Sequence, residues 1–293
     1  MKAFLGKVVL GISMGIMLLG SLAGAAESAP KGRYTHPIKC VSHQGERFDA
    51  PSHSRPAYEL AMQRKAEVVK LDVRFTKDGI AVLSHDSSLK RFLGWDVEIA
   101  DKTLQEIKEQ GTFLPVGGYE GEKLQTLAEA LAIIKDCPEF WIDTKTFPPK
   151  TLERIFAEFD RFGIDHSRLM LATGNPRAIL YAKKNFPDLR RVKHIYPQFL
   201  PKEGVVEHLL KEKEEFGLFG MNLPAKGFEQ GLLTEADLQR LRQAGLWCSI
   251  WFVQESNQAQ KYSEMGADAF VTDKIRNVRP YCRTPEAAPS AKE

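Results

Sequence analysis

The stretch VVKLDVRFTKDGIAVLSHD, residues 68–86, decides the fold and raises the question of function. It predicts two β-strands, 68–75 and 80–85, joined by a tight turn. Side chains two positions apart on a strand point to the same face, so Lys70 and Asp72 lie side by side among apolar neighbours. Burying such ions is costly unless they pair with each other or with a ligand. The pair therefore indicates either a structural ion-pair network or a functional site.

Short apolar runs alternate with helical patterns along the rest of the chain. Besides the first two, strands are expected at 38–43, 140–145, 168–173, 191–196, 218–223, 247–253 and 269–273. Between them, apolar residues recur at spacings of three and four, as at Leu124, Leu127, Leu131 and Ile134.

Strand–helix alternation predicts parallel strands covered by helices. About eight repeats over about 250 residues are typical of an α/β fold of the (β/α)8 TIM-barrel type. With nine candidate strands, one is expected to be an extra or irregular segment. An open doubly wound sheet is the alternative, but no GxGxxG follows the first strand.

The first 25 residues have the pattern of a signal peptide. Lys2 and Lys7 form a positively charged region before the apolar run VVLGISMGIMLLGSLAG, and Ala23-Gly24-Ala25 supplies the small residues of a cleavage site. We therefore expect cleavage and export to the periplasm or the medium. A membrane anchor is the alternative reading of this run.

The remaining chain, about 265 residues, suits one large α/β domain. We expect a linker over 26–37, a barrel domain over 38–280 and a disordered tail over 281–293, with no stable transmembrane segment after cleavage. Loss of Lys2 and Lys7 lowers the formal net charge from +3 to +1, which argues against nucleic acid as a partner.

Four cysteines permit disulfides in an exported protein. Cys40 and Cys282 flank the folded region and are the first candidate pair, while Cys137 and Cys248 lie inside it. Buried free thiols are the alternative for all four.

Polar residues concentrate at the ends of the expected strands, where TIM barrels carry their reactive groups. The first strand ends in His43, the third in His85, and the fourth carries Asp143 and Lys145. Two histidines on neighbouring strand ends suit proton transfer near neutral pH. The irregular stretch 86–123 is long enough to help build such a site. The other histidines lack such neighbours and are read as ordinary: His36, His53, His166, His194 and His208.

Five segments in this order resemble the glycerophosphodiester phosphodiesterase family: SHQG (42–45), LDVRFTKDG (71–79), LSHD (83–86), IDTK (142–145) and GADAFVTD (266–273). The family pattern runs H-R-G, E-x-D-V-x-x-T-x-D-G, H-D, E-x-K and G-x-D-x-x-x-T-D. WFVQ at 251–254 is similar to the W-T-V-N that precedes the last segment. The resemblance implies a phospholipase-C-like TIM barrel that hydrolyses a phosphodiester beside a divalent cation, calcium or magnesium. It also implies that His43 and His85 act as general acid and base, through a cyclic phosphate that water opens.

Several positions depart from the family pattern. The arginine after the first histidine is Gln44, and the downstream E-N-T is Ser52-His53-Ser54. The metal-binding glutamate of E-x-D is Lys70, and the glutamate of E-x-K is Asp143. Of the three acidic metal ligands, Asp72 stands unchanged and Asp143 is a substitute.

Charge counting suggests a role for Lys70. Three carboxylates around a divalent cation sum to −1, and Lys70 with Asp72 and Asp143 also sums to −1 without a metal. An ammonium held by two carboxylates could therefore face the phosphate oxygens in the cation's place. Phosphatidylinositol-specific phospholipases, a similar barrel family, include members with such a basic side chain.

The leading prediction is an exported phosphoric diester hydrolase acting on glycerophosphodiesters or related phospholipid headgroups, with metal-independence favoured. Lys70 and Lys145 stabilise the phosphoryl charge, and Gln44 and Trp251 contact the small-molecule substrate. One alternative is a divalent-metal enzyme that uses Asp72, Asp143 and another oxygen ligand. The other is a non-catalytic protein that binds a phosphorylated ligand or lipid headgroup.

Overall fold

The structure, a computed structural model, describes residues 37–110, 119, 121–147 and 150–282. The predicted signal peptide, the linker up to residue 36 and the tail beyond 282 lie outside the described residues and stay predictions. The packed chain continues through Cys282, two residues past the expected end of the barrel domain. Among the described helices, none combines the length and the apolar character needed to cross a bilayer.

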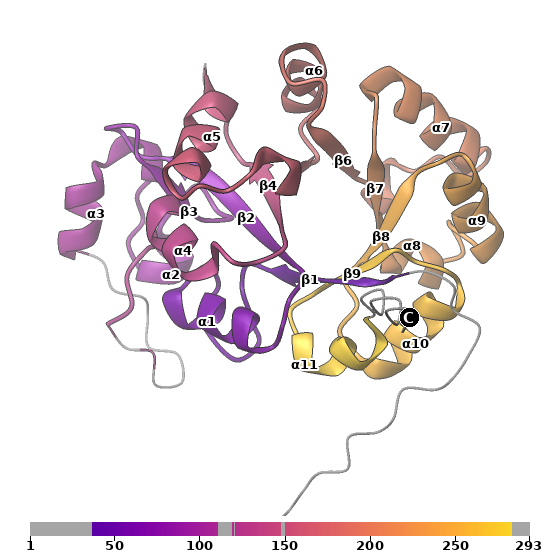
Figure 1. Cartoon of the computed structure of the whole chain (residues 1–293), viewed down its shortest axis with the longest axis horizontal. Helices are drawn as coiled ribbons and strands as arrows, with labels where there is room; N and C mark the ends of the chain where they lie inside the picture. The colour runs from indigo at the N-terminus through magenta and orange to yellow at the C-terminus, as the bar shows by residue number, and fades with distance from the viewer. Residues whose placement is uncertain (1–36, 111–118, 120, 148–149, 283–293) are drawn as a thin grey trace, which may run out of the picture. The chain divides into compact units, whose positions relative to one another are not determined.

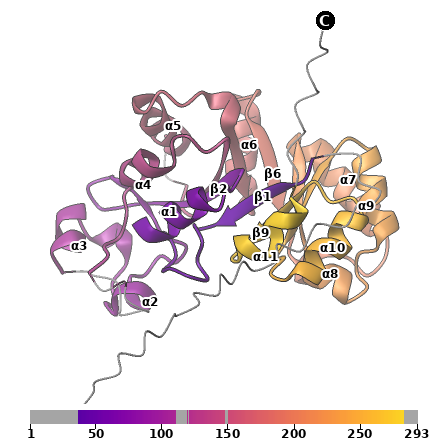
Figure 2. The ribbon, with the colours of Figure 1, turned by 60° about the horizontal axis from the view of Figure 1, so that its bottom comes forward.

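Eight parallel strands in the described part of the chain close into a barrel. In spatial order they are β1 (Lys39–His43), β9 (Ala269–Thr272), β8 (Trp247–Trp251), β7 (Gly220–Pro224), β6 (Arg190–His194), β5 (Leu169–Thr173), β4 (Glu139–Thr144) and β2 (Val68–Phe75). The barrel closes where β1 pairs with β2, with His43 beside Lys70. Figures 1 and 2 show β1 between β2 and β9. The predicted TIM barrel is confirmed, and the doubly wound alternative is wrong.

The ninth strand is the expected extra one. β3 (Ala81–Leu83) runs antiparallel to the end of β2, and Val73 pairs with Leu83. The hairpin turn is closed by the Gly79 amide, which donates to the Thr76 carbonyl at 2.8 Å, and Gly79 has a φ of 81°. The Ser84 amide then donates to the Asp72 carbonyl at 2.9 Å. This register delivers the following residue, His85, to the end of β2.

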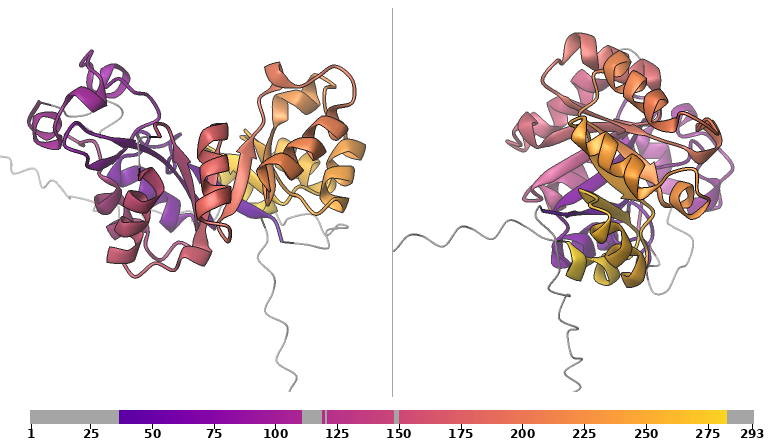
Figure 3. Two further views of the ribbon diagram at one scale, coloured as in Figure 1. Left: turned by 90° about the horizontal axis from the view of Figure 1, so that it is seen from above. Right: turned by 90° about the vertical axis from the view of Figure 1, so that its right-hand side faces the viewer.

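Helices cover the outside of the barrel (Figures 1 and 3). The described ones are α1 (Arg55–Gln63), α4 (Leu127–Ile134), α5 (Thr151–Arg161), α6 (Pro176–Asn185), α7 (Val205–Phe216), α8 (Ala225–Glu229), α9 (Glu235–Gln243), α10 (Ser256–Glu264) and α11 (Ile275–Val278). The predicted stripe is confirmed for Leu127, Leu131 and Ile134, which are buried on α4, while Leu124 precedes the helix. Side chains such as Thr126 and Thr234 accept from the first free amides and so fix where helices begin.

The barrel interior is filled by side chains and is not a pore. Strand residues alternate between the helices outside and the interior, as the period of two requires. The interior layer is apolar and comprises Val41, Val68, Trp141, Met170, Ala172, Val192, Ala269 and Val271. The charged strand side chains that point inward consequently lie at the two ends of the barrel, whereas Lys193 of β6 points outward to Glu212 of α7.

The irregular stretch after β3 forms a small helical insert. It contains α2 (Lys90–Leu93), η1 (Ile99–Asp101) and α3 (Leu104–Gln110), and residues 111–118 and 120 lie outside the described part. A separate apolar cluster holds it together, made of Val82, Leu89, Ile99, Ile107 and Leu124. The insert therefore packs on its own core beside β3.

All four cysteines are buried free thiols in the structure. The candidate Cys40–Cys282 bridge is not formed, although the two thiols lie close enough to interact, and burial together with Cys40 raises the pKa of Cys282. The Cys282 thiol donates to the Val278 carbonyl at 3.4 Å. The alternative of buried thiols describes this structure.

Candidate active site

The carboxyl ends of the barrel strands surround a cavity of about 250 Å³. This volume lies just below the ~300–1,000 Å³ of typical ligand pockets, which suits a small polar ligand. The lining includes every predicted site residue except Asp72, which is buried directly beside it: His43, Gln44, Lys70, His85, Asp143, Lys145 and Trp251. The structure thus brings together the residues that the sequence selects.

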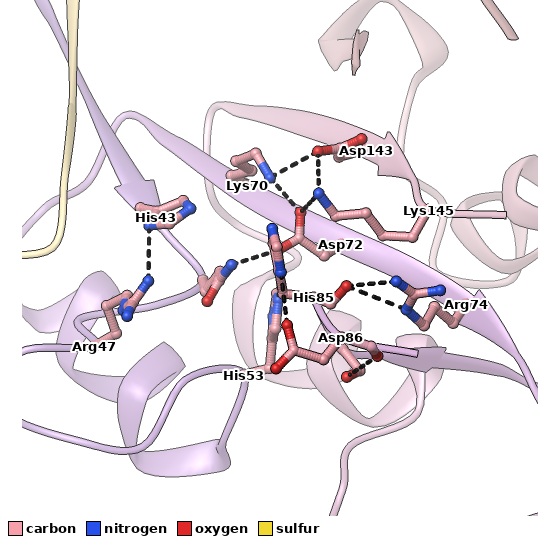
Figure 4. A network of polar contacts seen from close by, with 12 residues as sticks. His43, Arg47, His53, Lys70, Asp72, Arg74, His85, Asp86, Asp143 and Lys145 are labelled. Carbon is pink, nitrogen blue, oxygen red and sulfur yellow. Dashed lines mark hydrogen bonds and ion pairs between the residues drawn. The ribbon is translucent and has the colours of Figure 1, made fainter. Parts of the chain in front are cut away.

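Two lysines and two carboxylates form the centre of the site, the lysine cluster of Lys70, Asp72, Asp143 and Lys145 (Figure 4). Asp72 and Asp143 are register partners on β2 and β4, so their carboxylates lie at the same height. The Lys70 ammonium donates to Asp72 and, at 3.0 Å, to Asp143 Oδ2. The Lys145 ammonium lies 2.8 Å from the same Asp143 oxygen and 3.5 Å from Asp72 Oδ1.

The cluster stays ionised although it is buried. Burial alone would lower the pKa of Lys70, but Asp143 and Asp72 outweigh it and hold that pKa above its usual value. Burial would likewise raise the pKa values of Asp72 and Asp143, but the positive charges of Lys70 and Lys145 hold both below their usual range. Two ammonium and two carboxylate groups sum to zero charge.

His43 is part of a buried histidine–aspartate pair. Its Nδ1 lies 2.7 Å from Oδ1 of Asp273, which follows β9, and Gln254 donates to the other Asp273 oxygen at 2.8 Å. Burial lowers the pKa of His43 to about 4, although Asp273 acts in the opposite direction. At neutral pH the ring is therefore uncharged, its Nδ1–H donates to Asp273, and Nε2 is left as an acceptor. This is the protonation state that a general base requires.

His85 forms a second, more exposed pair. Its side chain is 48% exposed, and Nδ1 lies 2.9 Å from Oδ1 of the next residue, Asp86. Arg74 donates to the His85 carbonyl at 2.6 Å, and Arg91 of the insert lies 3.2 Å from Asp86. Both histidines line the cavity, and Figure 4 draws them together with the lysine cluster. The two histidines therefore differ mainly in burial.

His53 is bound to the lysine cluster, so its interpretation as an ordinary histidine is wrong. Its Nε2 lies 3.1 Å from Asp72 Oδ2, and Gln44 donates to the same oxygen at 2.5 Å. Both residues have a positive φ, 57° for His53 and 65° for Gln44, so the loop after β1 folds back over β2. The available signal was the position of His53 within Ser52-His53-Ser54, where the family carries E-N-T.

His194 also belongs to the site, contrary to expectation. It ends β6, lines the cavity, and its Nε2 lies 3.4 Å from Asp143 Oδ2. The signal was partial, because the expected strand 191–196 runs two residues past His194, which ends β6 in the structure. Further lining residues that sequence reasoning missed are Arg47, Arg91, Tyr196, Asn222 and Phe252.

The two residues expected to contact substrate lie at the cavity wall. Gln44 turns its amide to Asp72, while the nearby Arg47 brings a guanidinium to within 3.5 Å of both His43 and Asp273. The Trp251 indole donates to the Asn222 carbonyl at 3.0 Å, and its ring centroid lies 5.8 Å from that of Tyr196. Arg47 thus places a cation in the cavity on the same loop in which Gln44 replaces the family's arginine.

The side chains, as they stand, do not fit the divalent cation that the family resemblance implies. Such a site needs several oxygen ligands, and here the two acids are Asp72 and Asp143. Lys70 stands between them, and Asp72 also receives Gln44 and His53. Within the described residues no group of three acidic, histidine or cysteine side chains is arranged to hold a metal ion.

Known proteins resemble large parts of this chain. One relative, a glycerophosphodiester phosphodiesterase of Caldanaerobacter subterraneus, is 24% identical over 80% of this chain and 93% of its own. A Bacillus subtilis protein of the same name is 32% identical over 44% of this chain and 48% of its own.

Solved structures share the fold. An Oleispira antarctica phosphodiesterase in complex with the product sn-glycerol-3-phosphate superposes with a TM-score of 0.71, at 20% identity over 84% of this chain and 96% of its own. A glycerophosphodiester phosphodiesterase from Thermotoga maritima gives a TM-score of 0.65, at 24% identity over 83% and 97%.

The family model of the glycerophosphoryl diester phosphodiesterases matches residues 43–277, from the first histidine of the site to the helix after Asp273. This range contains the lysine cluster and both histidine–aspartate pairs. The chain therefore belongs to the glycerophosphoryl diester phosphodiesterase family, whose members are phosphoric diester hydrolases.

Proposed function

We propose that this protein hydrolyses glycerophosphodiesters or related phospholipid headgroups, with Lys70 in the electrostatic role of the divalent cation. The observation that carries the proposal is the ammonium of Lys70, which lines the cavity while it is held by Asp72 and Asp143. The relatives' names and the product bound in the Oleispira antarctica structure support this substrate class.

Charge balance supports the role of the lysines. A phosphodiester carries one negative charge, and the lysine cluster has no net charge of its own. Lys70 and Lys145 both line the cavity, so their N–H groups can face the phosphoryl oxygens without further rearrangement of the cluster. Donors fixed in advance in a poorly hydrated site are an effective way to stabilise charge that develops in a transition state.

The histidine pairs support the proton transfers. His43 Nε2 takes the proton of the substrate's glycerol hydroxyl, whose oxygen attacks phosphorus and forms a cyclic phosphate. His85 gives a proton to the oxygen of the departing alcohol as the phosphorus–oxygen bond breaks. Water then opens the cyclic phosphate with the two roles reversed, and both histidines return to their starting protonation states.

Export forms part of the proposal. The signal-peptide pattern of residues 1–25 would place the barrel outside the cytoplasm, in the periplasm or the medium. There the substrate would be a headgroup diester released from phospholipids.

The deciding experiment is turnover of glycerophosphodiesters by the purified protein, with and without chelator. We expect activity that survives chelation. Activity lost to chelator and restored by calcium or magnesium would overturn the role of Lys70 and favour the metal enzyme. Ligand binding without turnover of any phosphodiester would favour the binding-protein alternative. The names of the relatives do not favour that alternative.

A matched variant sharpens this experiment. Lys70→Glu restores the acidic residue of the family pattern and removes the ammonium between Asp72 and Asp143. We expect this variant to be inactive in chelator and to respond to added divalent cations. Arg190→Gln, at the opposite end of the barrel, serves as the control that should resemble the unmodified protein in both conditions.

A further inference from the structure

His194 lies at the cavity wall with one ring nitrogen unused. The side chain ends β6 and is 7% exposed, with Asn222 on one side of the ring and Asp143 on the other. Its Nε2 is buried and has no hydrogen-bond partner among the described residues, because the 3.4 Å approach to Asp143 Oδ2 has poor geometry. A buried polar atom without a hydrogen-bond partner lowers the stability of the folded protein, so its presence in a native structure often reflects a functional role.

A chain of hydrogen bonds indicates which nitrogen carries the proton. Ser249 Oγ donates to Asn222 Oδ1 at 2.8 Å, which turns the amide nitrogen of Asn222 toward His194. That nitrogen donates to His194 Nδ1 at 3.1 Å, so Nδ1 accepts and the proton lies on Nε2. The nearby Asp143 carboxylate independently favours the same tautomer, since it would repel a lone pair on Nε2.

His53 provides an internal comparison. In both histidines Nε2 faces a carboxylate oxygen. The distance from His53 Nε2 to Asp72 Oδ2 is 3.1 Å, against 3.4 Å from His194 Nε2 to Asp143 Oδ2. Its Nδ1 is bonded to the Tyr58 hydroxyl at 2.7 Å, so both ring nitrogens are used. His53 is also absent from the cavity lining, whereas His194 is part of it. The first histidine is a structural support, whereas the second lies beside the cavity with its Nε2 donor unsatisfied.

Three donors converge beside this cavity. The ammonium groups of Lys70 and Lys145 lie 3.0 and 2.8 Å from Asp143 Oδ2, and His194 Nε2 lies 3.4 Å from the same oxygen. All three side chains line the cavity, and Asp143 Oδ2 is the common neighbour of their donor nitrogens. We infer that His194 is a third hydrogen-bond donor to the substrate's phosphoryl group, an inference that rests on the proposed function for the identity of that group.

An uncharged donor at this place has a clear advantage. The lysine cluster is neutral, and a third full positive charge beside it would hold the anionic product tightly. Burial lowers the pKa of His194, so the ring remains a neutral N–H donor at physiological pH. It therefore adds a directed hydrogen bond without changing the net charge of the site.

The test is binding of sn-glycerol 3-phosphate and of inorganic phosphate, measured by calorimetry on the purified protein in chelator. His194→Ala should weaken binding about 10- to 100-fold, the effect of losing one hydrogen bond to a charged group. His194→Gln should stay within about threefold of the unmodified protein, because its Oε1 can accept from Asn222 while its Nε2 donates to the cavity. His166→Ala, an exposed histidine paired with Asp160, is the control that should change nothing.

Unchanged binding in His194→Ala, or equal loss in His194→Gln, would overturn the inference. So would absence of binding by the unmodified protein, or ¹⁵N NMR spectra in which His194 carries its proton on Nδ1. Failure of the proposed function is recognised separately: phosphate binding that depends on His194, in a protein without phosphodiester turnover, would contradict hydrolysis and leave the donor role intact.

Discussion

In the described part of the chain, the two ends of the barrel carry matching sets of polar residues, and the carboxyl end is the one that surrounds the candidate active site. Three strands each place a polar side chain at both ends, four residues apart. At the amino end these are Lys39, Glu139 and Arg190, and at the carboxyl end they are His43, Asp143 and His194.

The amino-end trio is an ordinary ion-pair group. Glu139 accepts from Lys39 at 2.6 Å and from Arg190 at 2.9 Å, with one bond to each carboxylate oxygen. The side chains of Lys39 and Arg190 are 33% and 24% exposed, so water screens them. At the carboxyl end the ions are buried, and donors such as His194 Nε2 remain unused beside a cavity. Burial and unused hydrogen-bonding capacity distinguish a site from a charged cluster.

The largest difference in kcat/KM between variants of the two ends should come from substitution of the histidines. His43→Ala and His85→Ala should each lower kcat/KM for a glycerophosphodiester by about 10²–10⁴-fold, because each removes an acid–base group. Lys39→Met, on the same strand as His43, should leave kcat/KM unchanged. Full activity in both histidine variants would show that the proton-transfer roles are wrongly assigned.

Removing one cation from each end should give the next largest contrast. Lys70→Gln should lower kcat/KM by about 10²–10³-fold, the usual cost of losing a preorganised donor to a transition-state oxyanion. Arg190→Gln should have no such effect. Because Lys70→Gln leaves two buried carboxylates short of a cation, the double variant Lys70→Gln/Asp143→Asn provides a charge-balanced form, and circular dichroism checks that both fold. A fully active double variant would contradict the role of Lys70.

Acid should lower the free energy of unfolding through the buried histidines at the carboxyl end. The pKa of His43 is about 4 in the folded protein against 6.5 unfolded, so between these values the unfolded chain binds a proton that the folded one does not. Stability should therefore fall as pH drops from 6.5 to 4, by about 3 kcal/mol from His43. His53 and His194, whose pKa values burial also lowers, act in the same direction.

Urea unfolding at pH 7 and pH 4.5 measures this dependence. His43→Gln should reduce the difference between the two values. An equal difference in the variant would mean that His43 is not the neutral, buried group described above.

The smallest effect should be found at the amino end. Glu139→Gln removes a carboxylate that is bonded to Lys39 and Arg190, and it should lower the free energy of unfolding by about 0.5–1 kcal/mol. Activity should stay within about twofold. A loss of activity comparable to that of Lys70→Gln would break the distinction between the two ends.

The sequence predicted the barrel because each strand is a short apolar run and the helices between them have regular apolar stripes. It also selected His43, Lys70, Asp72, His85, Asp143 and Lys145, since strand-end positions converge in any such barrel. The same rule indicates Asp273, which ends the expected strand 269–273, whereas His194 lies two residues before the end of the expected strand 191–196.

Other parts of the site could not be read from the sequence. The contact of His53 with Asp72 depends on the fold of the loop after β1, where Gln44 and His53 have positive φ values that neither residue type requires. Arg91 reaches the cavity because the insert packs on its own apolar cluster, which involves residues separated by more than thirty positions. Loop conformation and tertiary packing decide both cases.

The hairpin between β2 and β3 has a consequence for how this site can change during evolution or engineering. His85 lies outside the barrel strands and reaches the cavity because Val73 pairs with Leu83 across the turn at Gly79. Strand side chains alternate between faces, so a one-residue insertion that shifted this pairing would turn His85 away from the cavity. A two-residue insertion would restore its direction and move it along the strand. The length of this hairpin turn therefore determines the distance between the two histidines. It can be varied without a change in the barrel core.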